Sequence, residues 1–176
     1  MKLGHLWRAV QRPAHSAARD AISPRRPVLI KIAPDLDEKG LDDIVAVALA
    51  RKADGLIVSN TTIARPPSLK SAARVEAGGL SGRPLFEPST RLLALTYQRV
   101  GGALPLIGCG GVEDARTALA KIEAGATLVE LYTALALQGR ALIPKILMGL
   151  AAALDSRGVE SLGALKGTRA ADWARR

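Results

Sequence analysis

The chain has 176 residues and one cysteine, carries a formal net charge of +9, and is 48% hydrophobic but only 3% aromatic. This length suits one domain with a substantial core, and the composition is typical of α/β proteins whose helices pack closely on parallel strands. The single cysteine excludes a disulfide framework, the scarcity of aromatic side chains argues against nucleic-acid binding, and no apolar run reaches the roughly 18 residues that a membrane span requires.

The positive charge is concentrated near the N-terminus, where residues 1–27 contain six basic residues and one acidic residue. We therefore predict an irregular basic leader over residues 1–26 and one folded domain over residues 27–176. Both histidines, His5 and His15, fall in this leader, so we predict no metal site.

The first predicted strand, 28–33, is an almost continuous apolar run rich in branched residues, which suits a strand that is buried on both faces. Lys31 is the exception within it. Asp35 or Asp37 is expected to cap the helix that follows. A second buried strand is predicted at 56–60.

The segment 63–88 is rich in proline and glycine and is too long for a neutral connector, so we predict a functional loop. Strands and helices alternate in the rest of the chain. The predicted order is a helix at 89–100, a strand at 104–108, a glycine turn at 108–111, a helix at 113–124, a strand at 128–131 and a helix at 142–156.

Four strand-helix units in succession require parallel strands joined by right-handed crossovers. They are half of an eight-unit β/α barrel, which typically needs about 250 residues. We therefore expect about half of a TIM-type parallel β/α barrel. Such a half must pair with another copy or with a missing half, or else remain open.

Ligands of parallel α/β proteins gather at the carboxyl ends of the strands. The polar residues at these ends are Lys31, then Ser59, Asn60 and Thr61, then Gly110 and Gly111, then Tyr132 and Thr133. The loops after the last two strands of such barrels commonly hold a phosphate with backbone N–H groups. Glu113 is expected to start a helix whose dipole points toward this anion, although a plain glycine turn is the alternative.

Each of these groups also has an ordinary structural explanation. Lys31 needs a partner for its charge. The ordinary partner is a carboxylate or the solvent at the rim, and the functional one is an anionic or electron-rich ligand such as a flavin. Asn60 and Thr61 either read the edge of a planar amide-containing ring or only cap the turn. Cys109 has no histidine beside it in the sequence, so we interpret it as a small buried residue rather than a nucleophile.

Six ordered motifs from residue 27 onward resemble those of the class 2 dihydroorotate dehydrogenases. They occupy residues 31–36, 59–62, 65–66, 78–82, 108–112 and 131–135. The block Asn60-Thr61-Thr62 favours this quinone-using class over the soluble class.

The resemblance implies the C-terminal half of an FMN-containing barrel that oxidises (S)-dihydroorotate to orotate in UMP biosynthesis and passes the electrons to a quinone. It implies that Ser59 stands where the family more often has threonine. It also implies flavin contacts at Lys31, Ser59, Gly82, Gly111, Tyr132 and Thr133, and orotate contacts at Asn60 and Thr61.

In this family the catalytic serine, several orotate-binding asparagines and the helices of the quinone tunnel and membrane contact precede the matched part. We therefore assign no catalytic residue and expect little turnover from this chain alone. We expect a soluble cytoplasmic chain, although the resemblance implies a parent enzyme that is peripheral to the membrane. The alternatives are a non-catalytic phosphate- or flavin-binding half-barrel that self-associates through its exposed edges, and a basic protein that binds nucleic acid or a membrane surface through its leader.

Overall fold

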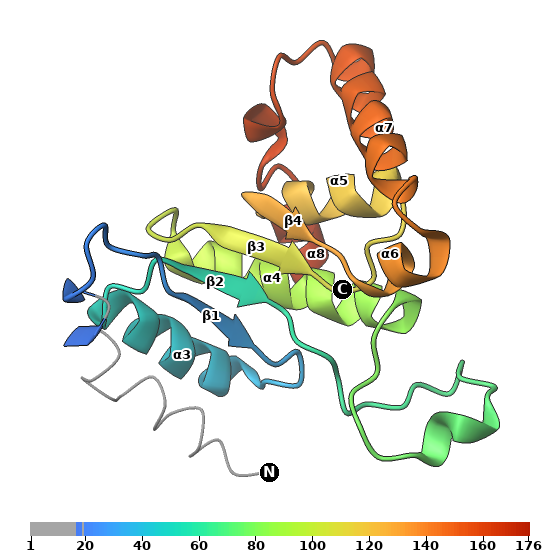
Figure 1. Ribbon diagram of the computed structural model, residues 1–176, viewed down its shortest axis with the longest axis horizontal. Helices are drawn as coiled ribbons and strands as arrows, with labels where there is room; N and C mark the ends of the chain where they lie inside the picture. Colours follow the sequence, from blue (N-terminus) through green and yellow to red (C-terminus); the bar gives the residue numbers. More distant parts are fainter. Residues whose placement is uncertain (1–16, 19) are drawn as a thin grey trace.

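The computed structural model describes residues 17, 18 and 20–176 (Figure 1). Its centre is one parallel sheet in the order β1-β2-β3-β4, formed by β1 (Leu29–Ile32), β2 (Gly55–Val58), β3 (Leu106–Cys109) and β4 (Leu128–Glu130). Strands that are neighbours in the sheet are also consecutive along the chain, and a helix follows each strand. The predicted α/β fold of four parallel strand-helix units is therefore confirmed.

The helices cover one face of this sheet and its β4 end (Figure 1). They are α3 (Glu38–Ala50), α4 (Phe86–Val100), α5 (Ala115–Glu123), α6 (Thr133–Gln138), α7 (Leu142–Arg157) and α8 (Ala170–Ala174), with short 3₁₀ helices η1 (Ala72–Val75), η2 (Arg83–Leu85) and η3 (Leu162–Leu165). The sequence pattern did not predict α6 or α8. Both are too short to show a helical period.

Side chains of the strands divide between two unequal faces, because successive residues of a strand point to opposite sides. Ile32, Leu56 and Val58 are fully buried in the main core against α3 and α4. On the first strand, however, Leu29 is 41% exposed and Lys31 is also exposed. The prediction that this strand is buried on both faces was therefore wrong, since helices pack on only one side of it.

Local capping explains where the helices begin. Asp37, the second of the two predicted caps, precedes α3 and accepts a hydrogen bond from the Gly40 N–H at 2.7 Å. Helix α4 begins at Phe86, three residues earlier than predicted. Pro88 lies in its first turn, where a missing N–H does not break the helix.

The predicted functional loop is folded back on itself by one arginine. The Arg65 guanidinium donates hydrogen bonds to the backbone carbonyls of Ile63, Ala64, Arg74, Glu76 and Gly78. Thr62 and Leu80 then form an isolated antiparallel bridge. The loop therefore returns close to the end of β2, and the residues that follow Leu80 approach the carboxyl edge of the sheet.

Most of the predicted basic leader, namely residues 1–16 and 19, lies outside the described residues. Within the described part, Arg25 binds Asp54 with an N–O distance of 2.6 Å, just before β2. None of the described helices is both long and apolar enough to cross a bilayer.

Candidate functional site

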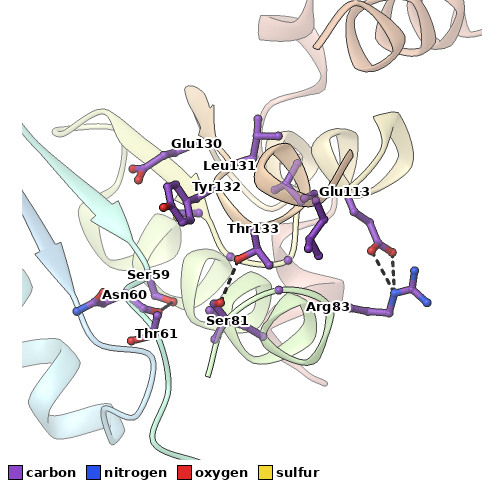
Figure 2. Close-up of a pocket in the computed structure, with 18 of the residues that line it drawn as sticks. Ser59, Asn60, Thr61, Ser81, Arg83, Glu113, Glu130, Leu131, Tyr132 and Thr133 are labelled. Carbon is purple, nitrogen blue, oxygen red and sulfur yellow. Dashed lines mark hydrogen bonds and ion pairs between the residues drawn. The ribbon is translucent and has the colours of Figure 1, made fainter. Parts of the chain in front are cut away.

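A hollow of about 580 Å³ lies at the carboxyl ends of the strands (Figure 2). This volume is within the range of about 300–1,000 Å³ that is usual for cofactor and small-molecule sites. All eight residues predicted to bind flavin or orotate line it: Lys31, Ser59, Asn60, Thr61, Gly82, Gly111, Tyr132 and Thr133. The four strand ends therefore share one cavity.

Lys31 reaches across the sheet to a carboxylate that the sequence did not single out. Its Nζ donates to Glu130 Oε1 at 2.8 Å, from the first strand to the last. Burial lowers the pKa of Lys31, but the hydrogen bond to Glu130 and the nearby charges of Cys109 and Glu130 outweigh this effect, so the net pKa is raised. Lys31 thus has a carboxylate partner, which is its ordinary structural explanation. It also lines the hollow, as contact with a flavin would require.

Ser59 and Asn60 are held by backbone contacts at the end of β2. Ser59 is buried, and its Oγ donates to the Asn60 carbonyl at 2.9 Å. The Asn60 N–H donates to the Ile32 carbonyl at 2.7 Å. These contacts fix the backbone and leave the Asn60 side chain exposed at the hollow (Figure 2).

The turn after β2 is capped by Thr62, and not by Asn60 or Thr61. The Thr62 hydroxyl donates to Asp35 and accepts from the Ala64 N–H. Within the described chain, the Asn60 amide and the Thr61 hydroxyl have no protein partner. The capping explanation therefore applies to Thr62, and Asn60 and Thr61 remain available to a ligand.

The glycine turn after β3 is pressed against the start of α4. Gly110 and Gly111 have φ angles of 103° and 72°, which side chains rarely adopt. A Cβ on Gly111 would lie 2.5 Å from Phe86 Cα, so this position excludes a side chain on steric grounds as well. The Gly82 and Gly111 N–H groups donate to no protein acceptor among the described residues, which suits an anion.

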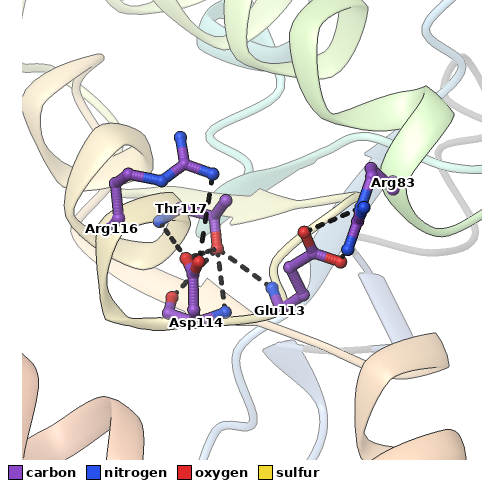
Figure 3. A network of polar contacts seen from close by, with 5 residues as sticks. All are labelled: Arg83, Glu113, Asp114, Arg116 and Thr117. Carbon is purple, nitrogen blue, oxygen red and sulfur yellow. Dashed lines mark hydrogen bonds and ion pairs between the residues drawn. The ribbon is translucent and has the colours of Figure 1, made fainter.

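Asp114, rather than Glu113, caps the helix after this turn (Figure 3). Its carboxylate accepts from the Thr117 N–H at 2.7 Å, and Thr117 Oγ1 accepts from the Asp114 N–H at 3.0 Å. Glu113 instead pairs with Arg83 at 2.9 Å. The prediction that Glu113 starts the helix was wrong, and because the cap occupies the N-terminus of α5, an anion would depend on the turn itself.

The end of β4 meets the loop that precedes α4. Thr133 Oγ1 donates to Ser81 Oγ at 3.0 Å (Figure 2). A Cβ on Gly82, whose φ is 76°, would lie 3.2 Å from Thr133 Cγ2. Tyr132 is 79% exposed. The structure therefore brings together two predicted phosphate contacts, Gly82 and Thr133, and adds Ser81. Ser81 lies in the motif 78–82, but the sequence assigned it no contact.

Cys109 lines the same hollow and is half-buried, whereas we predicted a small buried residue. Burial and the Glu130 charge raise the pKa of its thiol, outweighing the opposing effect of Lys31 and Lys121. A raised pKa keeps the sulfur protonated near neutral pH and disfavours a nucleophilic role.

Comparison with known proteins identifies relatives for nearly the whole chain. The family model for dihydroorotate dehydrogenase matches residues 6–154. A dihydroorotate dehydrogenase (quinone) of Allorhizobium ampelinum is 52% identical over 171 residues, which is 97% of this chain and 47% of that protein. One from Brucella anthropi is 54% identical over 153 residues, or 86% of this chain and 42% of that protein.

Solved structures agree with these sequence matches. A DHODH from Eimeria tenella in complex with ferulenol superposes with a TM-score of 0.79 and 40% identity, covering 82% of this chain and 38% of that one. The ligand-free form from the same organism gives a TM-score of 0.78. The chain thus spans about half the length of the curated relatives it matches, and its sheet corresponds to part of a TIM-type barrel. It belongs to the dihydroorotate dehydrogenase family.

Proposed function

We propose that this chain supplies the FMN- and orotate-binding strand ends of a dihydroorotate dehydrogenase. The reaction is the oxidation of (S)-dihydroorotate to orotate with a quinone as electron acceptor, in UMP biosynthesis. One observation carries the proposal: eight residues from four strand ends and the loop after β2 line a single hollow. Family membership selects the chemistry that this arrangement serves.

The residues around the hollow fit FMN. Gly82 and Gly111 offer N–H groups that have no partner among the described residues, and the Thr133 side chain lies beside Gly82 with its hydroxyl at Ser81, so this end suits a phosphate. Lys31 comes from β1, and its ammonium reaches across the hollow to Glu130 on β4, where it would stabilise an electron-rich ring. Bound FMN would supply the hydride acceptor for the substrate and the electron donor for the quinone.

Asn60 and Thr61 are the orotate contacts in this proposal. An amide side chain offers both a donor and acceptors, and a hydroxyl adds another of each, so the pair can match the edge of a ring that contains amides and a carboxylate. Both side chains are exposed at the hollow and keep their hydrogen-bonding capacity in the described structure. Ser59 holds the backbone between them and β2.

Other parts of the reaction fall outside the matched segment in this proposal. The chain corresponds to 47% and 42% of two relatives, and we assign the catalytic base, quinone access and membrane association to the remainder of such proteins. The comparisons give no support to a non-catalytic half-barrel, and self-association through exposed strand edges stays a prediction.

Flavin binding by the purified 176-residue chain tests the proposal. We expect FMN fluorescence to be quenched on binding, and riboflavin, which lacks the phosphate, to bind at least about tenfold more weakly, a difference of about 1.4 kcal/mol. Lys31→Met should weaken FMN binding by a similar factor, whereas Lys39→Met, on an exposed face of α3, should leave it unchanged. Equal affinity for FMN and riboflavin, or no quenching at all, would contradict the assignment.

A further inference from the structure

A buried lysine lies directly behind the glycine turn. Lys121, on α5, is fully buried, and its Nζ donates to Ser89 Oγ at 2.6 Å. The same Nζ lies 5.4 Å from the centre of the Phe86 ring. No carboxylate of the described residues pairs with it, so burial lowers the pKa of Lys121 to about 7, opposed only by Cys109. An ammonium buried without a carboxylate is costly and calls for an explanation.

Ser89 connects this lysine to the hollow. Its Oγ lies 2.6 Å from the Leu85 carbonyl and 3.2 Å from the Gly110 carbonyl. The approach is close enough that a Cβ on Gly110 would lie 2.8 Å from Ser89 Oγ. Gly108 similarly admits the stem of Lys121, since a Cβ there would lie 3.0 Å from Lys121 Cβ. The glycines of this segment thus make room for the Lys121–Ser89 pair.

The direction of the Ser89 hydrogen bond depends on the charge of Lys121. An ammonium has three donors and no acceptor, so protonated Lys121 only donates to Ser89, and the single hydroxyl proton must turn toward a carbonyl. A neutral amine has a lone pair and can accept that proton. The Leu85, Phe86 and Gly110 carbonyls share this one proton while the lysine is charged. Deprotonation of Lys121 therefore allows the Ser89 proton to turn away from them, so that Gly110 loses its share of the hydrogen bond.

Among the described groups that face Lys121, only one can itself titrate. Helix α4 presents Ser89 and Phe86, which carry no charge. Strand β3 presents Cys109, the one ionisable group of the described chain that acts on Lys121. Lys31 and Glu130 act on Cys109 in turn.

We propose that Lys121 is a positioning residue whose ammonium, acting through Ser89, holds the Gly110–Gly111 turn in the shape that binds an anionic phosphate group. Anion binding in the turn favours protonated Lys121 in return, because the two effects are linked. The inference rests on the proposed function in taking the phosphate of FMN as the anion. The link between lysine and turn is a property of the ligand-free chain.

Nuclear magnetic resonance of the ligand-free chain tests this link directly. We expect the Lys121 ¹³Cε signal to titrate with a midpoint near 7, and the Gly110 and Gly111 amide signals to follow the same midpoint. Lys121→Met should abolish this step in both glycines, and Ser89→Ala should abolish it while Lys121 still titrates. Lys145→Met, on an exposed turn of α7, is the matched control and should preserve it. Glycine signals that ignore the titration of Lys121 would overturn the inference, as would a Lys121 that stays charged up to pH 9.

Ligand addition separates this inference from the proposed function. Inorganic phosphate and FMN should each raise the Lys121 midpoint, and FMN affinity should fall roughly fivefold or more between pH 6.5 and 9 in the wild type but not in Lys121→Met. A midpoint unmoved by bound FMN overturns the ligand half of the inference. A chain that binds neither ligand overturns both that half and the flavin assignment, while the ligand-free titration still decides whether Lys121 controls the turn.

Discussion

Replacing Lys121 by methionine should remove a distinct pH dependence of folding stability. The wild-type side chain has a folded-state pKa of about 7 against an ordinary value of 10.5. Between these two pH values the unfolded chain holds a proton that the folded chain has released. Stability therefore rises with pH across this window, and it declines as the pH falls toward 7.

The size of the effect follows from the same displacement. Each pH unit inside the window changes the free energy of unfolding by about 1.4 kcal/mol, so the wild type should gain roughly 2 kcal/mol between pH 7.5 and 9 relative to Lys121→Met. The upper limit of pH 9 matters because the raised pKa of Cys109 acts in the opposite direction above its ordinary value of 9.0. Methionine keeps the length of the stem, and Ser89 keeps the Leu85 carbonyl as an acceptor, so the variant should fold.

Urea unfolding at constant ionic strength measures this difference. Trp173 is 5% exposed and stacks edge-on against Phe86 with ring centres 5.7 Å apart, so its fluorescence should report unfolding near α4. Taking the wild type minus the variant at each pH cancels the titrating groups that do not interact with Lys121. Cys109 does interact with it, and for this reason too the comparison stops at pH 9. Parallel stability curves for the two proteins between pH 7.5 and 9 would refute the reasoning, because the Lys121 pKa could then not be lowered.

Three further substitutions test the site and its supports. Gly111→Ala should lower the free energy of unfolding by about 1–2 kcal/mol because of the positive φ, and by about 1–3 kcal/mol more because of the clash with the Phe86 backbone. Gly102→Ala is the control in the same urea assay. Its φ is 84° and the space around it is open, so it should show only the first of these two losses. Asp114→Ala should lower stability by about 1 kcal/mol at neutral pH. Thr117 hydrogen bonds hold the pKa of Asp114 down against burial, so the wild type should lose this advantage as the pH falls below 3.8, and a difference that persists in acid would contradict the capping assignment. Glu130→Gln should lower the pKa of Lys31, seen in its ¹³Cε titration, whereas the exposed Glu160→Gln should not; an unchanged Lys31 titration would deny the Lys31–Glu130 contact.

The polar strand ends could be predicted because topology alone brings them together. Once parallel strands are expected, their carboxyl ends must lie on one edge of the sheet, whatever the exact helix boundaries. Lys31, Asn60 and Thr133 therefore reach one hollow although the sequence misplaced the starts of two helices, which lie at Phe86 and Ala115. Errors of two or three residues at helix ends do not move a strand end to another side of the sheet.

Partners that lie far apart in the chain could not be predicted in the same way. Lys31 interrupts one apolar run and Glu130 ends another, so both stand out in the sequence. They are 99 positions apart, however, and nothing in the sequence pairs them. Only the arrangement of the strands places the two side chains together at the hollow. The prediction that the first strand is buried on both faces was wrong for a related reason. An apolar run predicts that a strand is covered, but it does not say which side the covering elements come from.

Lys121 shows what residue spacing contains and what it omits. It follows Ala118 by three positions and Thr117 by four, and both of these residues are buried, so the helical period alone places the lysine on the covered face of α5. The period does not show that α4 offers it a hydroxyl instead of a carboxylate. That difference decides its role, since a carboxylate would fix the charge of the lysine, whereas Ser89 leaves the charge free to change and passes the change on to Gly110. A lysine on the buried face of a helix, behind a glycine turn at a strand end, is therefore a feature to examine wherever such a turn is assigned to a phosphate.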